Sequence, residues 1–243
     1  MSKRTIRFSR NRRIPLSYIS LITRVILSLH PSALTLLDMQ DVHYFQHILE
    51  LACTGNISAM YKAGVCYERA IGVDQDLDVA RCWFLRAAEA GNVDAMYTLG
   101  AHFERGIGIP TDLDSAKLWY ERAVAEGHPD AMCSLAGLYF MRKEYDEAFH
   151  WYHRAAHRGV QMAMHNLAVL YEKGFGVDRD WHQAWYWYLK AASGGDTSAM
   201  INLGIMYENG RGIEQDRQQA RSWYQKALVG GDERARKILQ DFA

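Results

Sequence analysis

Residues 196–231, DTSAMINLGIMYENGRGIEQDRQQARSWYQKALVGG, contain two short apolar patterns with the spacing of a helix face. The apolar positions are Met200, Leu203, Gly204 and Tyr207 in the first half, and Ala220, Trp223, Tyr224 and Ala227 in the second. The intervening GRGIEQD supplies glycines for the positive φ at a helix end, and Asp216 can cap the second helix. The stretch therefore predicts a helical hairpin. A hairpin of this length cannot bury its apolar face alone, so we expect it to stack on copies of itself.

The same two patterns recur along the chain. An Ala-Met pair marks the first helix of each unit, at Ala59-Met60, Ala95-Met96, Ala131-Met132, Ala163-Met164 and Ala199-Met200. A pair of aromatic residues marks the second helix, at Trp83-Phe84, Trp119-Tyr120, Trp151-Tyr152, Trp187-Tyr188 and Trp223-Tyr224. The Ala-Met pairs are 36 residues apart except for one step of 32, where FMRKEYDEA replaces a longer turn. We expect a tighter turn in that unit.

These residues resemble the Sel-one-like repeat family, whose units combine Ala-x-x-x-Leu-Gly, a Gly-x-Gly turn and a Trp-Tyr pair. The resemblance covers residues 55–231. Ala70 replaces a turn glycine, and Ala136 and Ala168 replace the helix glycine, where alanine is still small enough for close helix approach. The resemblance implies an all-α fold, a right-handed α-solenoid of tandem helix-turn-helix repeats (an α/α superhelix) related to tetratricopeptide arrays. It also implies a scaffold or adaptor for protein complexes.

Four segments are predicted from the repeat phase and from charge. They are a basic amphipathic segment (residues 1–37), a degenerate half repeat (38–55), five repeats (56–231) and a C-terminal capping helix (232–243). Residues 1–37 carry seven bases and no acid, which leaves 21 bases and 28 acids in the rest of a formally neutral chain. In the last segment Arg236 stands where the other units have methionine, as expected of a helix whose outer face meets water.

The basic segment allows four interpretations. The segment could be a targeting peptide, a helix lying on a membrane surface, or a helix docked on the open end of the solenoid. Alternatively, translation starts at Met39 and the assigned start lies too far upstream. We prefer the docked helix, because Arg24 interrupts the apolar run that a secretory signal needs. No charge-free run of about eighteen apolar residues is present, so we expect no spanning helix. A cytoplasmic location is expected, with export or an organelle as the alternative if this segment is a targeting peptide.

Candidate chemistry is sparse in this sequence. Cys53, Cys66, Cys82 and Cys133 do not follow the repeat period, so we expect reduced thiols, although two disulfides remain arithmetically possible. His150, His153 and His157 share a predicted helix face, but no fourth ligand is evident, so we expect no metal site. Glu68, Glu104, Glu172 and Glu208 recur with the repeat, which indicates bonds to turn amides or a surface role. We therefore expect no catalytic residue and no cofactor.

By resemblance to tetratricopeptide arrays, the two positions after each Ala-Met pair should face the concave side of the solenoid. These positions are Tyr61-Lys62, Tyr97-Thr98, Cys133-Ser134, His165-Asn166 and Ile201-Asn202. Their mixture of aromatic, amide and hydroxyl groups suits an extended peptide. The alternative is a solvated groove without a ligand. The partner-binding set that we select is Tyr61, Lys62, Tyr97, Thr98, His165, Asn166 and Asn202.

Trp181 and Trp185 form a second candidate surface. Both are additional to the repeat pattern, and tryptophan is enriched at binding hot spots, although added packing between units is favoured. Nucleic acid is not expected as a partner, because the repeats are net acidic. The sequence therefore predicts a monomeric, non-catalytic scaffold that binds a protein or peptide, with peripheral membrane contact possible through residues 1–37. The alternatives are an exported or envelope-associated effector on the same scaffold and, less favoured, a hydrolase.

Overall fold

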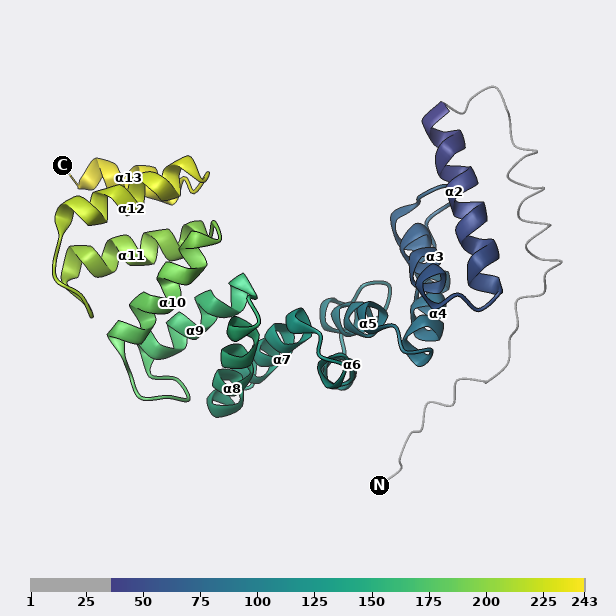
Figure 1. Ribbon diagram of the computed structural model, residues 1–243, viewed down its shortest axis with the longest axis horizontal. Helices are drawn as coiled ribbons and strands as arrows, with labels where there is room; N and C mark the ends of the chain where they lie inside the picture. Colours follow the sequence, from purple (N-terminus) through teal and green to yellow (C-terminus); the bar gives the residue numbers. More distant parts are fainter. Residues whose placement is uncertain (1–35, 243) are drawn as a thin grey trace. The chain divides into compact units, whose positions relative to one another are not determined.

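The computed structural model of this protein describes residues 36–242, which form twelve helices and no strand (Figure 1). The helices are α2 (Leu36–Cys53), α3 (Ile57–Arg69), α4 (Leu77–Glu89), α5 (Val93–Arg105), α6 (Leu113–Ala125), α7 (Pro129–Met141), α8 (Tyr145–His157), α9 (Gln161–Lys173), α10 (Trp181–Ser193), α11 (Thr197–Asn209), α12 (Arg217–Val229) and α13 (Arg234–Asp241). The predicted all-α fold is confirmed. The predictions for residues 1–37 fall almost wholly outside the described residues.

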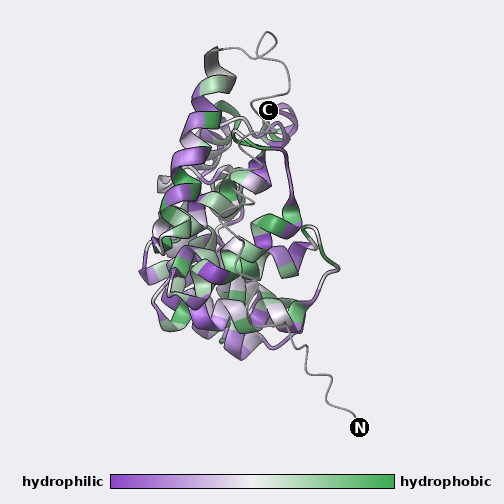
Figure 2. Cartoon of the chain, turned by 90° about the vertical axis from the view of Figure 1, so that its right-hand side faces the viewer, coloured by the Kyte–Doolittle hydropathy of each residue, from purple (hydrophilic) through white to green (hydrophobic). Residues whose placement is uncertain are grey.

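The chain divides into two compact units, with the boundary between Trp83 and Phe84 inside α4. In the first unit, α2 packs against α3, and Phe45 meets the edge of Tyr67 at 5.2 Å between ring centroids. In the second unit, each helix from α5 to α13 packs against the next one in the chain. Figure 2 shows hydrophobic and hydrophilic residues interleaved along these helices, as expected for helices with one buried face. No helix among the described residues is long and apolar enough to cross a membrane.

The alanine and aromatic positions of the repeat form the core. Ala95, Ala116 and Ala123 are fully buried, and so are their counterparts in the later repeats of the second unit. The aromatic residue of each pair fills the space that these small residues leave: the ring of Tyr120 lies directly on Gly100, and Tyr224 lies on Gly204. The small alanine and glycine residues therefore allow the helices to pack closely, and the tyrosine ring fills the remaining space.

Side chains at the helix starts explain why the helices begin where they do. Asp112, Asp180 and Asp216 each accept hydrogen bonds from two backbone N–H groups in the first turn of a second helix. The predicted cap at Asp216 is thus confirmed. Asn92 and Asp196 cap first helices by accepting from the N–H three residues on. These caps satisfy backbone N–H groups at the helix starts, although α8 and α9 begin at Glu144 and Val160 without a side-chain cap.

The second glycine of the Gly-x-Gly turn joins one repeat to the repeat before it. Gly176, at φ +67°, lies against the backbone of Tyr145 at the start of α8, and Gly212 lies against Trp181 at the start of α10. In the first unit, Gly72 lies in the same way against Asp41 in α2. A side chain would not fit at this position, so the turn docks through its backbone.

The shortened repeat, α7 and α8, uses side chains at the corresponding place. Its turn has three residues, and Lys143 adopts a positive φ of 62° where a glycine would be favoured. Arg142 Nη2 pairs with Asp114 Oδ1 of α6 at 2.6 Å, and the Lys117 ammonium lies 4.6 Å from the centre of the Tyr139 ring. An exposed ion pair and a cation–π contact thus replace the close backbone contact of the glycine, and the predicted tighter turn is confirmed.

We expect Ala70→Gly to stabilise the protein. Ala70 ends α3 in the left-handed conformation (φ 57°), at the position where Gly106, Gly174 and Gly210 end other first helices. Relief of the alanine strain outweighs the greater freedom of glycine in the unfolded chain, so a gain of roughly 0.5 to 1 kcal/mol is expected. Urea denaturation measures it. Ala90→Gly, an exposed change at the end of α4, is the control, and an equal effect of both changes would refute this account of Ala70.

Candidate functional site

In two repeats, the first of the two predicted binding positions after the Ala-Met pair contacts the start of the next repeat. The Tyr97 ring stacks on His128, with 4.7 Å between centroids, and His128 caps α7. His165 Nδ1 lies 3.0 Å from Oδ2 of Asp196, which caps α11. At the same position Cys133 and Ile201 are buried in the core, so the expectation that they face a groove is wrong. Tyr61 lies partly buried on α3 of the first unit.

The second predicted position reaches back to the preceding repeat. Side-chain hydrogen bonds join Ser134 to Tyr120, Asn166 to Tyr152 and Asn202 to Tyr188. Thr98 is partly buried, and Lys62 is exposed in the first unit. Several of the predicted binding residues therefore also join neighbouring repeats: the first position contacts the start of the next repeat, and the second contacts the second helix of the preceding repeat.

The recurring glutamates bond the core tyrosines of their own repeats. The hydroxyl groups of Tyr120, Tyr188 and Tyr224 donate hydrogen bonds to Glu104, Glu172 and Glu208, at 2.5, 2.8 and 2.7 Å. Each pair is 16 residues apart and lies within one repeat. The expectation that these acids bond turn amides is corrected: a buried tyrosine hydroxyl needs an acceptor, and the carboxylate supplies it.

The same surroundings raise the pKa of the core tyrosines. Burial is the largest cause for Tyr120, Tyr152, Tyr188 and Tyr224. The adjacent carboxylate adds to it for Tyr120, Tyr188 and Tyr224, because a second negative charge beside it is unfavourable. The hydrogen bonds from Ser134, Asn166 and Asn202 oppose these effects without reversing them. These hydroxyl groups therefore stay protonated as donors and cannot act as bases near neutral pH.

A groove of about 460 Å³ lies at the N-terminal ends of α9 and α11. Its lining consists of Gln161, Met162, His165, Asn166, Asp196 and Ser198. His165 and Asn166 belong to the predicted set, whereas Tyr97, Thr98 and Asn202 do not line this groove. The other four were not predicted, since the residues before an Ala-Met pair show no distinctive pattern. The volume falls in the range of small-ligand and peptide side-chain sites.

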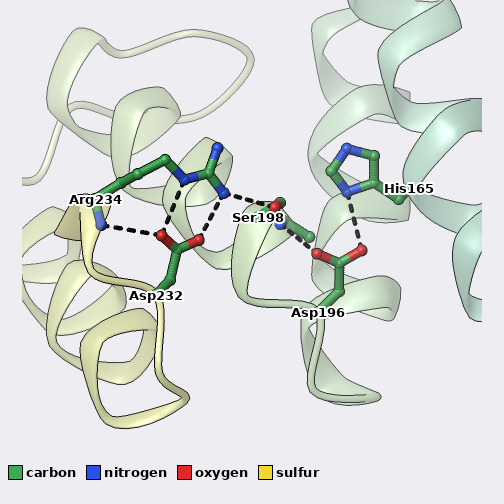
Figure 3. A network of polar contacts seen from close by, with 6 residues as sticks. His165, Asp196, Ser198, Asp232 and Arg234 are labelled. Carbon is green, nitrogen blue, oxygen red and sulfur yellow. Dashed lines mark hydrogen bonds and ion pairs between the residues drawn. The ribbon is translucent and has the colours of Figure 1, made fainter.

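A polar network holds one wall of this groove (Figure 3). Asp196 bridges His165 and the backbone N–H of Ala199, and Arg234 Nη2 donates to Ser198 Oγ at 2.7 Å while pairing with Asp232 at 2.6 Å. Burial alone would raise the pKa of Asp196, but its hydrogen bonds from His165 and Ala199 outweigh this and lower it. The groove wall is therefore a fixed, ionised carboxylate with a hydroxyl beside it.

Trp181 and Trp185 are half-buried and pack against the core of the second unit. The guanidinium groups of Arg179 and Arg211 lie 5.8 and 5.3 Å from the centre of the Trp181 ring, and Gly212 lies on its backbone. Arg211 and Gly212 belong to the turn of the next repeat. Trp181 therefore packs between neighbouring repeats, which is the alternative that the sequence favoured.

The thiols and histidines show no assembled reaction centre among the described residues. No disulfide joins Cys53, Cys66, Cys82 or Cys133, and burial raises the pKa of Cys133 to about 12, so this thiol is inert. Within residues 36–242, no group of three or more His, Cys, Asp or Glu side chains could hold a metal ion.

Helical hairpins that repeat about every 36 residues, joined through turns and capping side chains, define a class of α-helical repeat proteins. The Sel1 repeat pattern matches residues 57–92, 93–128, 130–160, 161–196 and 197–231. This chain belongs to the Sel1 repeat family, and its fold is an all-α helical repeat solenoid. Sel1 repeat proteins are generally scaffolds for protein interactions, and they are typically not catalytic.

Solved structures of Sel1 proteins are similar to this chain. The protective antigen c5321 of uropathogenic Escherichia coli, with an SLR fold, is 32% identical over 81% of this chain, with a TM-score of 0.79. The chain spans only 43% of c5321. A Sel1 repeat protein from Oxalobacter formigenes is 30% identical, with a TM-score of 0.75 and coverage of 82% of this chain and 85% of that chain. The comparison with curated proteins gives no match.

A third structure resembles this chain in fold alone. The immunity protein Pa5087 of Pseudomonas aeruginosa is 19% identical, with a TM-score of 0.52, and the match covers 88% of this chain and 82% of that chain. At this identity the likeness extends to the stacking of helices and not to the residues of the groove.

Proposed function

We propose that this protein is a non-catalytic scaffold that binds an extended peptide segment of a partner protein in the groove between α9 and α11. The observation that carries the proposal is the groove itself, because it combines hydrogen-bonding side chains with an exposed methionine and is large enough for a peptide side chain. The Sel1 family's general role as an interaction scaffold supports the protein-binding part.

The groove lining matches the groups of a peptide. The Asn166 amide has hydrogen-bonding capacity beyond its bond to Tyr152, and Gln161 adds a second amide, so both suit backbone N–H and C=O groups. Met162 is 68% exposed, which is unusual for a large apolar side chain, and its flexible thioether suits apolar side chains of varied shape. The ionised Asp196 carboxylate favours a peptide without an acid at the adjoining position.

The test begins with a peptide selected from a displayed library on the full-length protein. Its affinity is then measured by calorimetric titration for the wild type and for Met162→Ala with Asn166→Ala. We expect the double variant to lose roughly 1 to 3 kcal/mol of binding free energy, as truncation of two central contact residues usually does. The melting temperature is measured alongside, because Asn166 also bonds Tyr152.

A matched control is available on the neighbouring repeat. Met141 is also exposed, at 55%, at the end of α7 and away from the groove lining. Met141→Ala should leave the affinity unchanged. Equal affinities of the wild type and the double variant would contradict the groove as the site. Loss of peptide binding in Trp181→Ala or Trp185→Ala would instead place the binding site at these tryptophans.

A further inference from the structure

The last two turns of α8 carry three histidines, and two of them lie together. His153 and His157 are one turn apart, and their ring centroids are 4.2 Å from each other. Side chains four residues apart on a helix share a face, which is the spacing at which two imidazoles hold one metal ion in helical zinc sites. The ring of His150 lies nearly perpendicular to that of Trp151, with 5.2 Å between ring centroids.

The hydrogen bond of His157 leaves its other nitrogen available. His157 Nδ1 lies 2.8 Å from the backbone carbonyl oxygen of His153, so Nδ1 carries the proton and donates. In the neutral ring Nε2 then carries the lone pair, the arrangement in which a carbonyl oxygen orients a ligating imidazole. His157 is exposed, so an ion can reach Nε2 from solvent.

The charges around the histidine pair also suit a metal ion, which binds the neutral form of an imidazole. His157 is the last residue of α8, where the partial negative charge of the helix end favours a cation. Arg154, the one Arg or Lys within α8, is held over Trp151 at 4.7 Å, and the exposed Arg158 follows His157 at the end of the helix.

We propose that His153 and His157 form a surface site for a divalent late transition-metal ion, such as Zn²⁺, Ni²⁺ or Cu²⁺. Imidazole nitrogen selects these ions over Mg²⁺ and Ca²⁺, which prefer oxygen. The protein supplies two ligands, and water or the side chain of a bound molecule completes the coordination. This site is separate from the groove at α9 and α11, and its test does not depend on the proposed function.

Trp187 provides a reporter for this site. Its ring lies 5.0 Å from the His157 ring and 6.5 Å from the His153 ring, between centroids. Bound Cu²⁺ quenches the fluorescence of a tryptophan at this range, so part of the protein's emission should fall on titration. In Trp187→Phe that part of the quenching should be absent while calorimetry still detects the ion.

The experiment uses untagged full-length protein and titrates Zn²⁺ by calorimetry. We expect one ion per chain, a Zn²⁺-dependent rise in melting temperature, and a dissociation constant raised at least about tenfold in His153→Ala and in His157→Ala. His150→Ala, on the same helix, should keep the wild-type affinity. Because exposed thiols also bind zinc, the titration is repeated in Cys53→Ser with Cys82→Ser, where the histidine-dependent part should remain.

Three results would overturn the proposal. They are no Zn²⁺ binding at millimolar concentration, the same affinity in His157→Ala as in the wild type, and binding of Mg²⁺ as tight as that of Zn²⁺. A fall in the metal-free melting temperature of His157→Ala, without any change in the Zn²⁺-dependent rise, would show that the pair only packs against Trp187.

Discussion

Gly176→Ala is expected to destabilise the protein by roughly 2 to 5 kcal/mol. Gly176 has a φ of +67°, a conformation that costs an alanine roughly 1 to 2 kcal/mol. In addition, its Cβ would overlap the backbone carbonyl of Tyr145, which belongs to the preceding repeat and cannot rotate away. Steric overlap of this kind adds a further cost of roughly 1 to 3 kcal/mol. The free energy of unfolding from urea denaturation measures the effect.

Gly174 is the matched control for this substitution, because it lies in the same turn with a similar φ of +73°. An added Cβ there would meet nothing closer than 3.4 Å, which is ordinary contact. Gly174→Ala should therefore cost only the backbone strain, about 1 to 2 kcal/mol. If the two variants are equally stable, the docking of the turn on the preceding repeat contributes nothing beyond backbone conformation.

The free energy of unfolding should fall steeply above pH 10. Tyr120, Tyr152, Tyr188 and Tyr224 are buried and have raised pKa values in the fold. An unfolded tyrosine ionises near pH 10, so above this pH the unfolded chain loses protons that the folded chain retains. Their stabilising contribution is complete below pH 10 and is lost as the pH rises. Between pH 10 and 11 the loss is about 1 kcal/mol per tyrosine, or about 4 kcal/mol in all.

Urea denaturation at pH 8, 10 and 11 tests this expectation. Tyr188→Phe should be less stable at pH 8, because Glu172 and Asn202 lose their partner, but its stability should fall less between pH 10 and 11. Tyr186→Phe, on the exposed side of the same helix, is the control and should keep the wild-type slope. A free energy of unfolding that is constant from pH 8 to 11 would show that these hydroxyl groups are not held in the core as described.

The sequence predicts the helices and their phase well, because each repeat must place alanine and an aromatic residue at the same buried contacts. Ala95 and Ala199 are fully buried, as expected for residues that recur at the same helix contact in each repeat. The pairing of Glu104 with Tyr120 was also available in the sequence, because the 16-residue spacing recurs. Glu68 precedes Phe84 by the same interval, and phenylalanine has no hydroxyl to share.

The groove could be predicted only in part. His165 and Asn166 follow from the resemblance to tetratricopeptide arrays, but Gln161 and Met162 depend on how far apart α9 and α11 begin. Tyr97 occupies the same repeat position as His165 but stacks on His128, a cap residue of different shape. What each position contacts therefore depends on the cap of the next repeat, and no pattern within one repeat contains that information.

The joints between repeats and the proposed binding site share residues, which has a consequence for function. Asn166 bonds Tyr152 of the preceding repeat and also lines the groove. His165 joins α9 to the cap of α11 and lines it as well. A bound peptide would therefore contact side chains already fixed by neighbouring repeats, and fixed contact groups lose little entropy on binding.

Photo-cross-linking is the most direct measurement of the proposed binding site. A benzophenone amino acid is placed at position 162 or at position 141 of the full-length protein, and the selected peptide is added. We expect a cross-link from position 162 that excess unlabelled peptide abolishes, and none from position 141. Cross-linking of equal yield at both positions, or at neither position while the peptide still binds, would contradict the groove at α9 and α11 as the binding site.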